Sequence, residues 1–251
     1  MPRRLTGVWL GRRPYGAVLE LQRALHAARV RGEGQDVALL VEHDPVITLG
    51  RSAHAEHLLS SPGALREAGI EVFTVERGGD VTLHGPGQLV AYPIVDLGPD
   101  RRDVRRYVND LIEAMRRTAL DQGVVAGTVP GQVGLWVDRA NPTGWAGADG
   151  AVALAKLGAL GVRIARWVTF HGFALNVSID LQLYGHIVPC GVRAYPVTSL
   201  AALTGRAPAV SEVARAAHGH LAARLGAEPS LVVDDSASPL DPASPPPWFT
   251  A

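Results

Sequence analysis

Lysine occurs once in this chain, at Lys156 in the stretch AVALAKLGAL, although lysine and arginine together number 24. Arginine supplies every other basic side chain of these two types, so a plain surface charge at this position would be expected to be arginine as well. Arginine stays protonated under ordinary conditions, whereas a lysine amine can release its proton in suitable surroundings. Lys156 is therefore a candidate for acid–base chemistry. The alternative is an ordinary surface lysine that has survived by chance.

Cysteine also occurs once, at Cys190 in YGHIVPCGV, where a proline and a glycine flank it. Such a corner can hold a thiol on a turn. A free thiol has a pKa near ~8.5 and needs a nearby cation to become a nucleophilic thiolate at neutral pH, and Lys156 could supply that cation. A lone cysteine beside Ile and Val is also typical of a buried small hydrophobic residue. The local sequence alone favours this second interpretation.

A glycine-rich segment, RGGDVTLHGPGQ, runs from Arg77 to Gln88. Glycines let backbone N–H groups approach a ligand closely and adopt positive φ angles. A wide hairpin connection would also use them, but Arg77 and His84 make a bare turn a poorer explanation. The segment matches neither the Walker A pattern nor the dinucleotide fingerprint. The sequence therefore gives no motif support for an ATP or NAD site.

Other histidines are better explained by structure than by chemistry. His171 and Asn176, in TFHGFALNV, lie at the start of a predicted strand, where a lone histidine is more often a hydrogen-bonded structural residue. Two histidine pairs also occur, His54 with His57 and His218 with His220. No nearby cysteine or carboxylate completes a metal site around either pair, so we expect both pairs to be solvated. No metal is expected.

The composition describes a globular chain without a broad electrostatic footprint. Of 251 residues, 47% are hydrophobic and 19% charged, with 24 basic and 24 acidic side chains. This balance implies neither nucleic acid nor an anionic membrane as a partner. One cysteine excludes an intrachain disulfide framework. The N-terminal stretch lacks the apolar segment of a signal peptide, and no apolar run is long enough to span a bilayer. We expect a cytoplasmic protein.

Three helices and several strands must position these side chains. Apolar periodicity predicts helices over 15–31, over 103–121 and from Ser211 to 225. Two strands are predicted around the turn at Asp44-Pro45. Further β-rich segments are EVFTVE, LVAYPIVDL, GLWVD, AVALAKLG, GVRIARWVTF and FALNVSI. This pattern favours one α+β domain over residues 1–226, followed by a flexible Pro/Ser-rich tail over 227–251.

Taken together, these stretches resemble the octanoyltransferases of lipoate biosynthesis. The resemblance rests on EHDPVITLGR, RGGDVTLHGPGQLVAYPIVDL, GLWVD, AKLGALGVRIARWVTFHGFALNV, IVPCGV and VTSL, which follow one another in this order between residues 42 and 200. It implies a single-domain fold like the biotin and lipoate protein ligases (class II synthetase-like), with a mixed sheet flanked by helices. Two departures are visible: Leu83 replaces an aromatic residue common before the histidine, and the loop over 140–150 is longer than usual.

The resemblance also implies site residues. It places a catalytic Cys–Lys dyad on Cys190 and Lys156. It places the acyl pocket on three stretches: Arg77, Gly78, Gly79, Asp80, Val81, Thr82, Leu83 and His84; Ala159, Leu160 and Gly161; and Gly172, Phe173 and Ala174.

The implied reaction moves an octanoyl group from octanoyl-acyl carrier protein, through a Cys190 thioester, to a lysine of a lipoyl domain. The acceptors would be the E2 subunits of 2-oxoacid dehydrogenases and the glycine cleavage H protein. No cofactor is expected, because a thioester can form an amide without ATP. Lysine at position 156 would fit this reaction, since an arginine could not cycle a proton. The alternatives are an ATP-dependent lipoate or biotin ligase, and a non-catalytic acyl- or lipoyl-domain-binding protein.

Overall fold

The computed structural model describes residues 3–189, 195–234 and 246–250. An eight-stranded sheet forms its centre, in the order β11-β1-β2-β6-β10-β9-β8-β7. Strands β11, β1 and β2 run parallel to one another, and the remaining neighbours pair antiparallel. Its strands are β1 (Arg3–Arg13), β2 (Val37–His43), β6 (Gln88–Ile94), β7 (Gly127–Val129), β8 (Gln132–Asp138), β9 (Leu154–Ala165), β10 (Val168–Asn176) and β11 (Ala227–Val233).

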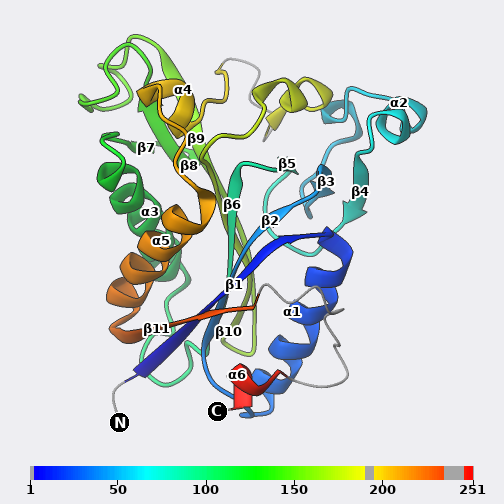
Figure 1. The fold of residues 1–251 in the computed structure, drawn as a ribbon, viewed down its shortest axis with the longest axis vertical. Coiled ribbons are helices and arrows are strands. Elements are labelled where there is room, and N and C mark those ends of the chain that lie inside the picture. Colours follow the sequence, from blue (N-terminus) through cyan, green and yellow to red (C-terminus); the bar gives the residue numbers. More distant parts are fainter. Residues whose placement is uncertain (1–2, 190–194, 235–245, 251) are drawn as a thin grey trace.

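Helices cover both faces of this sheet (Figure 1). Helix α1 (Tyr15–Val30) packs on β10 and β6, while α3 (Val104–Asp121) and α5 (Val210–Leu225) pack together on the opposite face. Each buries the apolar stripe that the sequence predicts. Helix α3 begins where the Asp103 side chain accepts a hydrogen bond from the Arg106 N–H, a typical N-cap. The predicted mixed sheet flanked by helices is confirmed.

A second sheet of three strands, in the order β4-β3-β5, lies at one end of the molecule. It consists of β3 (Val46–Leu49), β4 (Glu71–Thr74) and β5 (Val81–His84), with α2 (Pro62–Glu67) leading into β4. Strand β5 lies inside the glycine-rich segment, so this segment is more than a connection. The remaining short elements are the 3₁₀ helices η1 (Ala55–His57) and η2 (Leu181–His186), α4 (Leu200–Thr204) and α6 (Pro247–Thr250).

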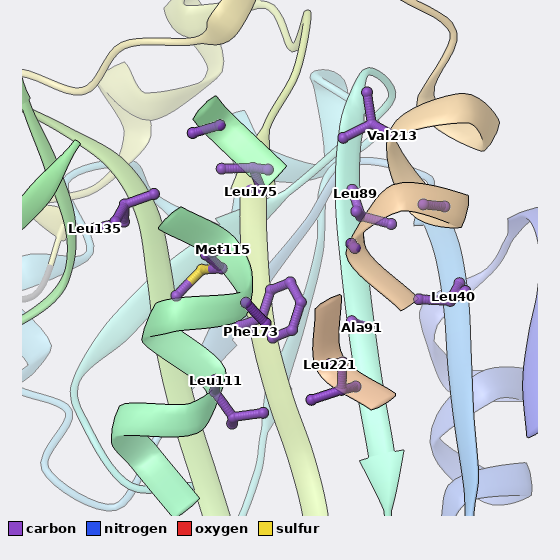
Figure 2. Packing of buried hydrophobic residues seen from close by; sticks show 14 of the residues in the cluster. Leu40, Leu89, Ala91, Leu111, Met115, Leu135, Phe173, Leu175, Val213 and Leu221 are labelled. Carbon is purple, nitrogen blue, oxygen red and sulfur yellow. The ribbon is translucent and has the colours of Figure 1, made fainter. Parts of the chain in front are cut away.

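The core under α3 and α5 is continuous with the sheet (Figure 2). Met115 of α3 lies beside Phe173 of β10, Leu221 of α5 lies beside Ala91 of β6, and all four belong to one cluster of buried side chains. A separate cluster joins α1 to the other face of the sheet. Packing on both faces holds the central strands rigid, which is what a precisely placed site requires.

Two boundaries differ from the sequence predictions. AVALAKLG and the first half of GVRIARWVTF, predicted as separate strands, form the continuous strand β9. A turn at Arg166 and Trp167, both with positive φ, then divides GVRIARWVTF, and its second half belongs to β10. Residues 227–233, where we expected the tail to begin, form β11 and pair with β1. Phe249 of α6 is only 1% exposed. Residues 235–245, the middle of the expected tail, lie outside the described residues. Among those described, no helix combines the length and apolar character needed to cross a membrane.

Candidate active site

Lys156 lies near the start of β9 with its side chain enclosed, at 6% exposure. Its Nζ atom is 5.4 Å from the centroid of the Trp136 ring on the neighbouring strand β8. Gly134, also on β8, leaves space for the lysine, since a Cβ atom there would lie 2.7 Å from Lys156 Cε. A surface lysine would have none of these constraints, so the interpretation of Lys156 as an ordinary surface charge is wrong.

The backbone of Lys156 pairs with the segment that follows the predicted nucleophile in sequence. Its N–H donates to Pro196 O and its carbonyl accepts from Thr198 N–H, both at 2.9 Å. Lys156 lines a small cavity, which we call the lysine cavity. Its lining consists of Thr82, Lys156, Gly158, Ala159, Asn176, Tyr184, Pro189 and Val197. Cys190 itself lies outside the described residues.

A second, mainly apolar cavity, which we call the tail cavity, adjoins the lysine cavity and shares Thr82 and Ala159 with it. It is lined by Tyr15, Arg77, Gly79, Asp80, Thr82, His84, Val90, Tyr92, Ala159, Leu160, Gly161, His171, Gly172, Phe173 and Ala174. The structure thus brings together the three sequence stretches predicted to hold an acyl chain.

Three residues of the predicted set are absent from this lining. Val81 and Leu83 alternate with Thr82 and His84 along β5, so their side chains pack into the core of the small sheet. Gly78 contributes its backbone instead: its N–H donates to Val162 O of β9 at 3.0 Å. The binding role of the whole set stays a prediction.

Glycines let the glycine-rich segment lie directly against β9. A Cβ atom on Gly161 would come within 2.7 Å of Gly78 O, and Gly79 has a φ of +86°, which favours glycine. The Arg77 guanidinium is anchored beside them, donating to the Thr48 carbonyl at 2.7 Å and to its hydroxyl at 2.9 Å. These contacts close one wall of the tail cavity.

Asp80 joins this wall to the segment around η1, which precedes it in sequence. Its carboxylate accepts from His54 N–H at 3.2 Å and lies 2.5 Å from His57 Nδ1. The prediction that His57 is merely solvated is therefore wrong, because a carboxylate distant in sequence folds against it. His218 is also not solvated: it is 2% exposed, and its Nε2 lies 2.9 Å from Ser230 O. No group of metal-ligating side chains occurs within the described parts of the chain.

A buried network connects the tail cavity to the segment beside Lys156. His84 Nδ1 donates to Gln88 Oε1 at 2.7 Å, and Gln88 Nε2 donates to Asn176 Oδ1 at 2.9 Å. Asn176 in turn donates to Thr198 O at 2.9 Å and accepts from the Tyr184 hydroxyl. Asn176 is therefore a hydrogen-bonded structural residue. The network fixes the wall between the two cavities.

Four residues of the tail cavity were missed at the sequence level: Tyr15, Val90, Tyr92 and His171. The first three belong to apolar patterns that equally describe core residues. His171 was expected to be a hydrogen-bonded structural residue, but neither ring nitrogen has a partner among the described residues. Its φ of +59°, rare outside glycine, is a signal that only the structure reveals.

Burial keeps the histidines around this cavity neutral. It lowers the pKa of His84 and of His171 to about 3, and that of His43 to about 4. His43 Nδ1 donates to Arg13 O at 3.0 Å, so its Nε2 is the acceptor for the Tyr92 hydroxyl at 2.8 Å. The cavity therefore combines apolar walls and neutral histidines with two charged side chains, Arg77 and Asp80, which are paired with Thr48 and His57. An enclosed amine next to such a cavity suits acyl transfer better than recognition of a charged ligand.

Comparison with known proteins agrees with this geometry. The model of the lipoyl protein ligase A/B catalytic domain matches residues 14–222. An octanoyltransferase of Solibacter usitatus is 49% identical over 198 residues, which cover 79% of this chain and 83% of that protein. One from Chloroflexus aurantiacus is 46% identical over 213 residues, covering 84% and 90%. The chain belongs to the octanoyltransferase family.

As a member of the octanoyltransferases, the chain is an acyltransferase, and the resemblance seen in the sequence is confirmed. A solved structure of the putative lipoate protein ligase Ta0514 from T. acidophilum, with bound lipoic acid, has the same fold. It superposes with a TM-score of 0.68 over 93% of this chain and 90% of that one, at 16% identity.

Proposed function

We propose that the chain transfers the octanoyl group through a thioester on Cys190, with Lys156 as general acid and base. The observation that carries this proposal is the lining of the lysine cavity. Pro189, which precedes Cys190, and Val197, which follows it, both line the cavity around Lys156. Backbone hydrogen bonds from Lys156 to Pro196 and Thr198 fix the same segment.

In the first step the Cys190 thiolate attacks the carbonyl carbon of an octanoyl thioester. A new C–S bond forms, the bond to the donor thiol breaks, and Lys156 gives its proton to the departing sulfur. The neutral Lys156 amine can then act as a base in the second step. General acid–base groups of this kind typically contribute about 10²–10⁴-fold to the rate.

In the second step a lysine amine of the acceptor attacks the Cys190 thioester. An amide bond forms, the Cys190 thiolate leaves, and Lys156 takes the proton that the amine loses. Both partners of the dyad return to their starting states. No nucleotide is consumed, since the thioester supplies the driving force.

The donor in this proposal is octanoyl-acyl carrier protein, and the acceptors are lipoyl domains of E2 subunits and the glycine cleavage H protein. The apolar walls of the tail cavity support a medium-length aliphatic chain, with Leu160, Phe173 and Ala174 among its lining residues. The adjoining lysine cavity would hold the thioester.

Intact-mass measurement tests this proposal. Incubation with octanoyl-acyl carrier protein and no acceptor is expected to add one octanoyl group, which hydroxylamine removes. Cys190→Ser should abolish the adduct, because an alcohol ionises far less readily than a thiol. An adduct that still forms on Cys190→Ser would contradict the thioester. Transfer that occurs only with ATP would instead indicate a ligase, and binding without turnover a docking protein.

A further inference from the structure

His171 lies at the end of the tail cavity away from Lys156, because it pairs with Val162, three residues farther along β9 than Ala159, which lines both cavities. Tyr15 and His171 line the tail cavity but not the lysine cavity. Both ring nitrogens of His171 are buried without a hydrogen-bond partner among the described residues, and Tyr15 lies beside His84 in the same lining. The exposed fractions are only 2% for Tyr15 and 1% for His171. A cavity built for hydrocarbon alone would not need these groups.

The backbone directs the His171 ring into this end. Phe173 and Leu175, at alternate positions of β10, belong to the core under α3 and α5, and regular alternation would send His171 to the same side. The left-handed φ of +59° breaks the alternation. A non-glycine residue in this conformation costs on the order of 1–3 kcal/mol, and such strain concentrates at binding sites.

His84 adds an acceptor beside Tyr15. The two rings stack with their centroids 6.2 Å apart. Since His84 Nδ1 donates to Gln88 and the ring is neutral, its Nε2 atom is an acceptor. His171 is kept neutral by burial and by the charges of Arg77, Arg163 and Arg23. The uncharged groups of Tyr15, His84 and His171 therefore share the cavity with the Arg77 guanidinium, which donates to Thr48 and to Gly78 O.

A purely aliphatic tip leaves the His171 ring nitrogens unpaired. A buried donor or acceptor without a partner costs about 1–3 kcal/mol, whereas a hydroxyl that pairs with it removes the cost. A site built to hydrogen-bond a hydroxyl therefore discriminates strongly in its favour. An aliphatic tip would gain only from the apolar walls, which the hydroxylated chain contacts as well.

We propose that the tail cavity accepts medium-chain acyl groups with a hydroxyl at the end remote from the thioester, held by Tyr15 and His171. This rests on the proposed function, because the same cavity receives the octanoyl tail. It adds a substrate class, the ω-hydroxyacyl thioesters, to that function.

Competition between 8-hydroxyoctanoyl and nonanoyl thioesters tests the proposal, since the two differ only in a hydroxyl for a methyl group at the tip. Octanoyl thioester is the internal standard. The full chain is expected to use the hydroxylated chain at least as well as nonanoyl. A preference for nonanoyl, with octanoyl still transferred, would overturn the hydroxyl site and leave the proposed function standing.

Single substitutions test which side chains cause the preference for the hydroxylated chain. Tyr15→Phe should lower the 8-hydroxyoctanoyl to nonanoyl ratio about fivefold, the value of one hydrogen bond of ~1 kcal/mol. His171→Leu should lower it further, while His171→Asn, which tolerates a left-handed backbone and keeps hydrogen-bonding atoms, should preserve more of it. The control is Tyr107→Phe, which removes a buried hydroxyl in the core under α3 and should leave the ratio unchanged. An unchanged ratio in Tyr15→Phe and in His171→Leu would contradict the proposal.

Calorimetric binding of free 8-hydroxyoctanoate and nonanoate decides the matter independently of turnover. Tighter binding of the hydroxylated acid, lost in Tyr15→Phe, would support the site even if no thioester were transferred. In that case the proposed function would fail and the binding site would remain. Weaker binding of the hydroxylated acid would overturn the site by itself.

Discussion

The Lys156 amine lies 5.4 Å from the centre of the Trp136 indole ring, which covers it from the neighbouring strand. An aromatic face attracts a cation and excludes water from one side of it. Gly134, two residues before Trp136 on the same strand, lies against the aliphatic stem of the lysine. Strand β8 therefore restricts the direction of the Lys156 side chain, and β9 fixes the position of the Lys156 backbone.

Gly134→Ala should lower turnover at least tenfold. The added Cβ would lie 2.7 Å from Lys156 Cε and 2.6 Å from Gly158 O, so the lysine side chain must move. A matched control is Gly131→Ala, which also replaces a glycine of positive φ but meets no atom within 4 Å. Turnover per folded molecule should fall only in Gly134→Ala. Equal turnover in the two variants would show that the position of the amine is not critical.

Phe249→Ala should destabilise the fold by about 3–5 kcal/mol, the usual cost of removing a buried aromatic side chain. Phe249 packs into the core beneath α1, and its carbonyl accepts from Gln35 N–H at 3.2 Å. Urea unfolding measures the loss. Val152→Ala, at a side chain that is 85% exposed, is the control and should change stability by less than about 0.5 kcal/mol. A silent Phe249→Ala would contradict the docking of α6.

Acid should destabilise the protein in part through His43. Burial lowers its folded pKa from 6.5 to about 4, so the unfolded chain binds a proton at pH 5 that the folded chain does not. The stabilisation present above pH 6.5 is therefore lost as the pH falls toward 4. One such proton corresponds to ~1.4 kcal/mol per pH unit.

His43→Gln should remove this part of the pH dependence. Urea unfolding free energies at pH 6.0 and pH 4.8 would give the slope for each protein. The variant should be less stable at pH 7, because hydrogen bonds to Arg13 and Tyr92 are disturbed, yet lose less stability on acidification. The same slope in both proteins would show that His43 is not the titrating group.

The helices and most central strands follow from local patterns. The apolar spacing over 15–31 predicts α1, and the apolar stripe over 103–121 predicts α3. The pairing of β1 with β11 could not be predicted, because these strands lie at opposite ends of the chain and only tertiary packing joins them. The surface on which Phe249 docks could not be predicted for the same reason, because residues far away in sequence form it.

The candidate site was partly visible in the sequence. Rarity of residue type singled out Lys156, and the glycines singled out the wall against β9. The place of Tyr15 and Tyr92 in the tail cavity was not visible, since both fit ordinary amphipathic patterns. The left-handed backbone of His171 is a property of the folded strand, and the residue types around position 171 do not predict it.

The most direct test of the account is octanoyl transfer by Lys156→Arg. This change keeps a positive charge beside Trp136 but removes a group that can cycle a proton. The proposed mechanism predicts a folded protein with unchanged thermal stability to within a few degrees and with turnover reduced about 10²–10⁴-fold. Lys156→Ala should in addition react more slowly with iodoacetamide at Cys190 than Lys156→Arg does. Full activity in Lys156→Arg would contradict the acid–base role of this lysine, and with it the proposed mechanism.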